Sequence, residues 1–317
     1  MNKSTLKYIA KRLVIAVITL IIIITILFFM LKLMPGSPFN SEKLTPEQMA
    51  LVYEKYGLDK PVYVQLIQYL KNMLSGDFGQ SFSVARNVDV KELILPRAKI
   101  SFSIGLLSVL FGTVVGVALG IFAALRHNTI WDNIATVISV LGVSIPSFVF
   151  ALALLILFGV KIPVFPVIYN TNKPFVSAIL PMLALSVGVI ANVARFTRSE
   201  MIEVLGSDYL LLAQAKGLDK KHLIKHHALR NTLIPVITIL APILVSLLTG
   251  SMVIEQIGGI PGLGTLLVKA IEVNDYNVIM AIAFMYSLLY IVIMLLVDIS
   301  YGLIDPRIRL TKGAHHG

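Results

Sequence analysis

Long apolar segments alternate with shorter polar segments along the chain. Uncharged stretches long enough to cross the roughly 30 Å hydrocarbon core of a bilayer are Leu13–Leu31, Ile100–Leu125, Ile134–Val160, Phe175–Ala194, Asn231–Ile254 and Tyr276–Val297. A backbone exposed to lipid must satisfy its own hydrogen bonds, so each stretch predicts a membrane-spanning helix. The pattern therefore predicts an all-α polytopic membrane protein with six transmembrane helices.

One long polar segment separates the first two predicted spans. Within it, "LTPEQMALVYEKYGLD" has a Thr-Pro start and a helical pattern that ends at Gly57. "KPVYVQLIQYLKNMLSGDFG" predicts a second amphipathic helix that ends near Gly76. We therefore expect a small helical extracellular segment packed on the outer membrane face. The predicted divisions are residues 1–34 (N-terminus and first helix), 35–99 (extracellular segment) and 100–317 (core of five helices, with a cytoplasmic loop at about 200–231).

Composition supports a membrane protein, because 57% of the 317 residues are hydrophobic and only 14% are charged. The net charge of +10 is interpreted by location. If the N-terminus is cytoplasmic, more than half of the 27 Lys and Arg and fewer than half of the 17 Asp and Glu lie on the cytoplasmic side. The positive-inside rule then predicts a multi-pass protein of the cell membrane with both termini in the cytoplasm. The long first apolar run indicates a retained anchor rather than a cleaved signal peptide.

A basic stretch, "AQAKGLDKKHLIKHHALRN", lies between the fourth and fifth predicted spans, at Ala213–Asn231. Apolar residues are mixed with Lys and His, which predicts short amphipathic helices. Gly217 permits a sharp turn or the close approach of another backbone. Asp219 can cap the next helix at its N-terminus. The predicted helix–break–helix element is suited to docking on a cytoplasmic partner. The alternative is a membrane-surface helix that contacts anionic lipid.

The segments "DYLLLAQAKGL" and "HHALRNTLIP" resemble the cytoplasmic loop of permease subunits of ABC importers. The resemblance is closest to the B-type permease of dipeptide and oligopeptide importers and covers nearly the whole chain. Further similar segments, in order, are "MPGSPF" (34–39), "YGLDKPVYVQ" (56–65), "GDFGQSF" (76–82), "SIPSFVFAL" (144–152), "ARFTRSEMIEVL" (194–205), "GSMVIEQIGGIPGLG" (250–264) and "DPRIRL" (305–310). Such an ordered set is far more specific than any one fragment.

The resemblance implies that the loop is a coupling helix, which sits in a cleft on an ATPase subunit. The residues assigned to this coupling loop are Ala213, Ala215, Lys216, Gly217, Leu218, Asp219 and His222. The general family motif begins Glu-Ala-Ala, whereas Leu211, Leu212 and Ala213 occupy those positions here. The acidic contact that the motif would provide is therefore missing.

The same resemblance implies the partners and the mechanism. A second homologous permease would complete the path, two ATPase subunits would bind ATP and Mg, and an extracellular or periplasmic binding protein would deliver peptides. Membrane lipid is the one further partner expected. Binding of nucleic acid is not expected. The chain would be a transporter subunit rather than an enzyme, with no cofactor of its own. Import would proceed by alternating access.

Three alternatives remain beside this interpretation. The resemblance extends to permeases for nickel or glutathione. The chain could instead be a channel or carrier that works without ATPases, although its nearly uncharged spans disfavour an ion-coupled carrier. A signalling receptor would need a cytoplasmic output domain, and only seven residues follow Leu310.

Two further patterns have ordinary explanations. His222 and His226 are spaced to share a helix face, but no Cys exists in the chain and no third His converges nearby, so we expect no metal site. Prolines in or at the ends of the predicted spans are Pro146, Pro181, Pro235 and Pro242. We expect them to make the helices irregular, and a gating hinge is the alternative.

Overall fold

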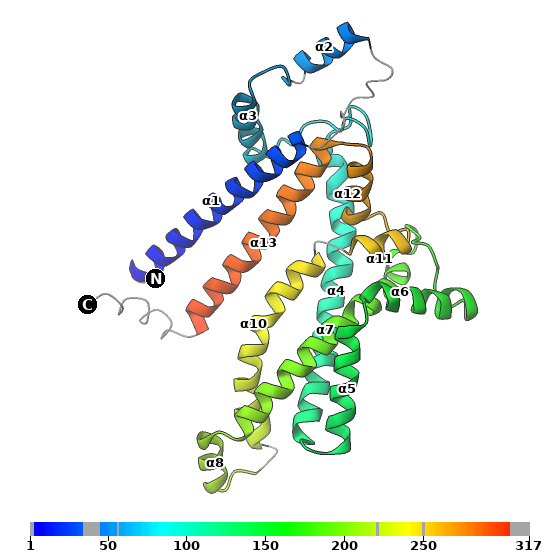
Figure 1. Cartoon of the computed structure of the whole chain (residues 1–317). Coiled ribbons are helices and arrows are strands. Elements are labelled where there is room, and N and C mark those ends of the chain that lie inside the picture. Colours follow the sequence, from blue (N-terminus) through cyan, green and yellow to red (C-terminus); the bar gives the residue numbers. More distant parts are fainter. Residues whose placement is uncertain (1–2, 34–44, 56, 220–221, 249–250, 305–317) are drawn as a thin grey trace. The chain divides into compact units, whose positions relative to one another are not determined.

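The computed structural model describes residues 3–33, 45–55, 57–219, 222–248 and 251–304 (Figure 1). Two of the similar segments, at 34–39 and 305–310, lie outside these residues. The elements are α1 Lys3–Leu33, α2 Pro46–Lys55, α3 Val62–Leu74, α4 Val90–Leu125, α5 Ile130–Ser144, α6 Ser147–Leu155, the π-helix η2 Ile156–Lys161, α7 Pro174–Leu205, α8 Asp208–Ala215, the π-helix η3 Leu223–Ala228, α10 Leu229–Leu248, α11 Met252–Ile257, α12 Leu263–Glu272 and α13 Tyr276–Ile304. The predicted all-α class is confirmed.

The chain forms two compact units. Unit 1 takes the described residues up to Lys99 and those from Thr265 onward, and unit 2 is Ile100–Gly264. The helix α4 begins in unit 1 and continues into unit 2. The second boundary falls inside α12, between Gly264 and Thr265, and α13 belongs to unit 1.

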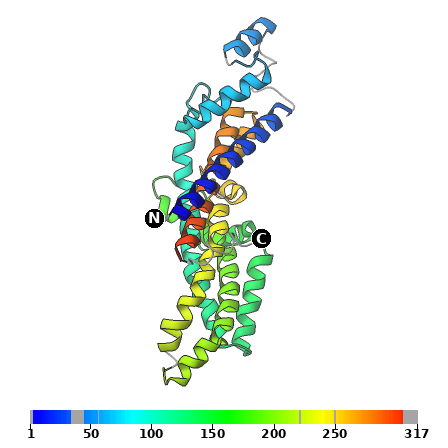
Figure 2. The same ribbon diagram turned by 90° about the vertical axis from the view of Figure 1, so that its left-hand side faces the viewer.

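In unit 1, α1 and α13 contact each other (Figures 1 and 2). The helix α3 contacts α1, where the rings of Phe28 and Tyr69 lie 5.9 Å apart. Both helices predicted between the first two spans are present as α2 and α3. Gly57 and Gly76 follow them with φ of 65° and 76°, a left-handed conformation that ends a helix at low cost for glycine.

In unit 2, α7 is the central helix, because α5, α6 and α10 all contact it. The helix α4 also approaches it closely through glycines spaced four residues apart. A Cβ at Gly112 would lie 2.6 Å from Cβ of Val189, and one at Gly120 would lie 2.5 Å from the carbonyl oxygen of Ala194. Small residues of this kind let transmembrane helices pack backbone to backbone. A buried cluster on α7 and α10 comprises Val189, Val193 and Val236.

Five helical segments of the described chain are long and apolar enough to span a membrane, and a bent pair makes up to six. The five are Ile9–Leu33, Val90–Leu125, Pro174–Leu205, Leu223–Leu248 and Tyr276–Val297. Five to six spans agree with the predicted architecture. Their outer faces carry many exposed apolar side chains, as lipid or partner helices require.

The predicted span over Ile134–Val160 is broken near Pro146, where an irregular helix was expected. The pair Ile130–Ser144 and Ser147–Lys161 is bent by 96°. Ile145 is extended, with φ −86° and ψ 125°, because a residue before proline is sterically pushed out of the helical region. Pro146 is the N-cap residue of α6, which begins at Ser147. By contrast, Pro181, Pro235 and Pro242 remain inside their helices.

The predicted span Asn231–Ile254 also divides into two elements. Helix α10 ends at Leu248, and α11 begins at Met252. The hydroxyl of Ser251 accepts a hydrogen bond from the backbone N–H of Ile254 at 3.4 Å, which caps the new helix. The predicted span Phe175–Ala194, in contrast, is longer than expected, since α7 continues to Leu205.

Candidate functional site

The predicted coupling loop is mostly helical in the structure. Its first residues, 200–205, continue α7. That helix ends at Gly206, whose N–H donates a hydrogen bond to the carbonyl of Ile202 at 3.1 Å. Ser207 is extended and starts α8, which covers eight residues. Beyond Asp219, η3 leads directly into α10. Among the described residues, the non-helical parts of the loop are Gly206–Ser207 and the short break around Gly217.

Gly217 ends α8 in a Schellman motif, the standard termination in which a left-handed residue follows the helix. Its φ is +83°, its N–H donates to the carbonyl of Gln214 at 3.0 Å, and the N–H of Leu218 donates to the carbonyl of Ala213 at 3.4 Å. The predicted turn is confirmed. No described atom lies within 4 Å of a Cβ built at Gly217, so this side of the turn is open.

Asp219 caps the following helix, as predicted. Its Oδ1 accepts a hydrogen bond from the backbone N–H of His222 at 2.9 Å, the i to i+3 geometry of an N-cap. The rings of His222 and His226 stack with centroids 4.4 Å apart, so the two do share a face. Across the described residues, no group of three or more His, Cys, Asp or Glu could hold a metal ion.

One buried cluster joins the helices before and after the turn at Gly217 to the ends of α4 and α7. It comprises Ala124, Met201, Leu210, Leu223 and Ala228, with Ala213 packed against it. These residues come from α4, α7, α8 and η3, so the position of α8 is fixed by packing on the ends of the long helices. A buried hydrogen bond from the Thr232 hydroxyl to the Met201 sulfur, at 3.3 Å, adds to this anchorage.

The predicted coupling residues separate into two groups. Ala213 and Leu218 are half-buried and support the turn, whereas Ala215, Lys216, Gly217, Asp219 and His222 are exposed. The structure therefore presents the end of α8 and the turn together, on one side of the buried cluster. A partner would meet small and basic residues there.

Two exposed leucines were not predicted as site residues. Leu211 and Leu212 are 55% and 58% exposed on α8, while Leu210 beside them is 2% exposed. This exposed apolar pair is available for contact with a partner or with lipid. The signal in the sequence was the run of three leucines, of which a helix this short can bury only part.

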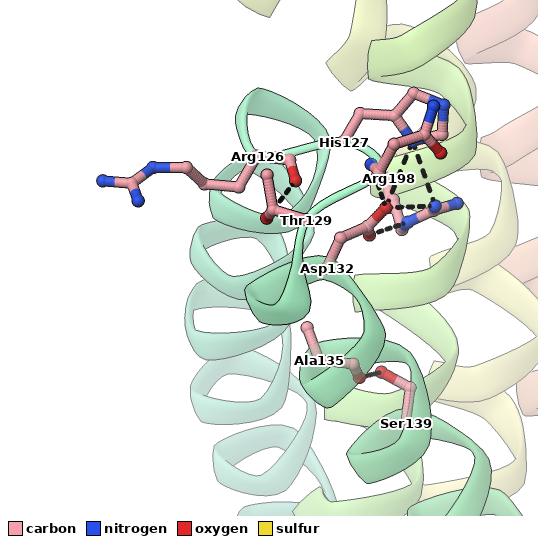
Figure 3. Close-up of polar contacts among 8 residues, drawn as sticks. Arg126, His127, Thr129, Asp132, Ala135, Ser139 and Arg198 are labelled. Carbon is pink, nitrogen blue, oxygen red and sulfur yellow. Dashed lines mark hydrogen bonds and ion pairs between the residues drawn. The ribbon is translucent and has the colours of Figure 1, made fainter.

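A partly buried ion pair joins α5 and α7 (Figure 3). Arg198 of α7 donates from Nε to Oδ1 of Asp132 at 2.5 Å and from Nη2 to Oδ2 at 2.7 Å. Asp132, in the first turn of α5, is 2% exposed, and Arg198 is 27% exposed. The backbone N–H of Asn128 and the ring of His127 also contact Oδ2, each at 3.1 Å. Sequence reasoning counted these charges only as orientation signals, because 66 residues separate the two partners.

The fold and the loop define a polytopic helical membrane protein with a helix–turn–helix element between two of its spans. The model of the family described as binding-protein-dependent transport system inner membrane component matches residues 116–310. A second model, for the N-terminal part of such membrane components, matches residues 5–91. The chain belongs to this family of transport components.

Relatives match along nearly the whole chain. The dipeptide transport system permease protein DppB of Lactococcus lactis subsp. cremoris is 44% identical over 96% of this chain and 99% of its own length. The oligopeptide transport system permease protein OppB of Haemophilus influenzae is 42% identical over the same shares. A solved structure of the MetNI methionine ABC transporter in inward-facing conformations covers 62% of this chain and 91% of that chain, at 16% identity and a TM-score of 0.48.

These matches confirm the resemblance inferred from the motifs. The chain is a multi-pass membrane component of a transport system and not an enzyme, as predicted.

Proposed function

We propose that this chain is one of two permease subunits in an ATP-driven importer of dipeptides or oligopeptides. The substrate class is supported by the names of relatives that are 42–44% identical over 96% of the chain. The relatives are named for both dipeptide and oligopeptide systems, so the proposal covers the class and leaves the peptide length to experiment.

The observation that carries the mechanism is the exposed end of α8 with its open turn. Lys216 and Gly217 are exposed, and the space where a side chain of Gly217 would lie is free of described atoms. Leu212, which is also exposed, would offer an apolar side chain to the partner beside them. A cleft on an ATPase subunit can therefore approach the backbone of the turn closely. Two ATPase subunits would dock in this way, one on each permease.

The remaining partners follow from the same proposal. A second, homologous permease completes the translocation path, and a binding protein outside the membrane delivers the peptide. ATP and Mg are bound by the ATPase subunits, so this chain holds no cofactor. Both termini lie in the cytoplasm, as does the loop with α8. ATP binding moves the loops and shifts the path between inward-open and outward-open states, which requires the partners to interact differently with the two states.

Two experiments test the proposal. The tagged chain is first purified from its native membrane in mild detergent, and the proteins that accompany it are identified by mass spectrometry. We expect a second six-span permease and one or two ATPases that carry a phosphate-binding loop. Recovery of this chain alone, also after cross-linking, would favour a carrier that works without ATPases.

The purified complex is then placed in liposomes with its binding protein and tested for ATP-dependent uptake of labelled dipeptides, longer peptides, nickel and glutathione. Uptake of peptides is the expected result. ATP-dependent uptake of nickel or glutathione alone would keep the importer and overturn the peptide assignment.

A further inference from the structure

The turn between α4 and α5 is organised around the carboxylate of Asp132. Asn128 in this turn has φ +61°, an uncommon left-handed conformation for a residue other than glycine. Its backbone N–H donates to Oδ2 of Asp132, and the N–H of Asp132 donates to the carbonyl of Thr129 at 3.1 Å. The hydroxyl of Thr129 in turn donates to the carbonyl of Arg126 at 2.5 Å. The carboxylate thus fixes both the turn and the start of α5.

Arg198 connects this turn to α7. Its guanidinium donates hydrogen bonds to both carboxylate oxygens of Asp132 (Figure 3). This two-point contact fixes the orientation of the two side chains as well as the distance between them. Close packing continues along the same helices. A Cβ at Gly142 of α5 would lie only 2.9 Å from Cβ of Ala191 on α7. Helices α5 and α7 are therefore held together by packing near the end of α5 and by the ion pair near its start.

The ion pair also lies close to the point where the loop joins the long helices. From Arg198, α7 continues for about two turns to Leu205, and α8 starts at Asp208. Ala124, just before the turn, belongs to the buried cluster that holds Leu210 of α8. A displacement of α8 therefore acts on the end of α7, about two turns from the ion pair, and on Ala124 just before the turn.

We propose that Asp132 and Arg198 are positioning residues for transport, which fasten the turn 126–129 and α5 to α7 so that a movement of α8 displaces α5 and α7 together. Helix α5 leads through Ile145 and Pro146 into α6, so the displacement reaches α6 as well. This inference rests on the proposed function, because it assigns the ion pair to the transmission of a movement that an ATPase imposes.

A role in stability alone does not require this arrangement. Apolar side chains of similar volume often stabilise a core as well as a buried ion pair does. What the ion pair adds is a fixed relative orientation of two helices that are separated by 66 residues of chain. The test must therefore measure coupling and orientation rather than stability.

The first readout is the number of peptides taken up per ATP hydrolysed, measured with the full complex and its binding protein in liposomes. Arg198→Lys keeps the charge but loses the two-pronged contact, and Asp132→Asn keeps the shape but loses the charge. We expect both variants to lower the ratio about fivefold or more, the lower end of typical coupling energies. Arg126→Gln is the matched control, because it removes an exposed charge from the same turn that does not contact Asp132 in the described structure. A normal ratio in assembled Arg198→Lys complexes would overturn the proposal.

The second readout does not depend on transport. The chain has no Cys, so spin labels attached to Arg126→Cys and Glu203→Cys report one distance between the turn and the end of α7. We expect a narrow distance distribution in the otherwise unchanged chain and a broader one with Arg198→Lys. An unchanged distribution would overturn the positioning role. If the unchanged complex took up no peptide while Arg198→Lys broadened the distribution, the proposed function would fail and the positioning role would stand.

Discussion

The side-chain amide of Asn231 donates a hydrogen bond to the hydroxyl oxygen of Tyr209, with 2.8 Å between the two atoms. The bond joins the start of α8 to α10 and closes the loop at its base. Tyr209→Phe removes it without changing the ring. Because Tyr209 is 44% exposed, we expect a loss of only about 0.5 kcal/mol, which corresponds to roughly twofold faster amide hydrogen exchange in residues 208–218.

Hydrogen exchange followed by mass spectrometry measures this effect. Tyr290→Phe, at another exposed tyrosine on α13, is the control and should leave exchange in the loop unchanged. Equal exchange in the Tyr209 and Tyr290 variants would contradict a closing role for the hydrogen bond.

Variants at Gly217 separate the need for a turn from the need for close approach. Asn and Asp tolerate the left-handed conformation better than other side chains do, and the described structure leaves room for them. Gly217→Asp and Gly217→Asn should therefore insert into the membrane normally but uncouple ATP hydrolysis from uptake, because the added side chain meets the ATPase.

Membrane amount, ATPase activity and uptake are measured on the same preparations. Normal uptake by Gly217→Asn would show that only the turn matters, and normal uptake by both variants would remove the coupling role from Gly217.

Truncation of Leu210 and of Leu212 to alanine should affect different properties of the protein. Leu210→Ala leaves a cavity in the buried cluster, so we expect it to lower the free energy of unfolding by about 3 kcal/mol. Leu212→Ala removes an exposed side chain and should leave stability unchanged, while weakening association with the ATPase about fivefold or more.

Thermal unfolding in detergent and a titration with purified ATPase distinguish the two variants. Tight ATPase binding by Leu212→Ala would argue against docking through the exposed face of α8.

The same substitution at two helical glycines tests the close packing of α4 on α7. At Gly120, a Cβ would lie 2.5 Å from the carbonyl oxygen of Ala194, so Gly120→Ala must push the two helices apart. At Gly188 of α7, none of the described atoms lies within 4 Å of a new Cβ. Gly188→Ala should therefore be neutral or stabilise the helix by about 0.5–1 kcal/mol.

Thermal unfolding of the purified protein compares the two. We expect a lower midpoint for Gly120→Ala only. Equal midpoints would mean that α4 and α7 do not rely on this approach.

Features set by local chemistry were predictable from the sequence. The apolar runs indicated the spans because a bilayer imposes a minimum length. The left-handed turn at Gly217 and the cap by Asp219 were predictable because each depends on a few neighbouring residues.

Features set by tertiary packing were not predictable. Pro146 breaks its helix whereas Pro181 does not, although each proline disfavours the helical conformation of the residue before it. The ion pair between Asp132 and Arg198 brings together two helices far apart in sequence. The exposure of Leu212 likewise depends on which face of α8 meets the buried cluster.

The central claim is that the end of α8 docks on an ATPase subunit. The chain has no Cys, so Ala215→Cys places a single thiol on the exposed end of α8, where a thiol-linked photo-cross-linker can be attached within the assembled complex. Lys173→Cys, exposed near the start of α7, is the control. We predict that illumination cross-links the Ala215 variant to the ATPase and does not cross-link the Lys173 variant to it. An assembled complex in which the cross-linker at Ala215 reaches only lipid, while uptake remains ATP-dependent, would contradict the account.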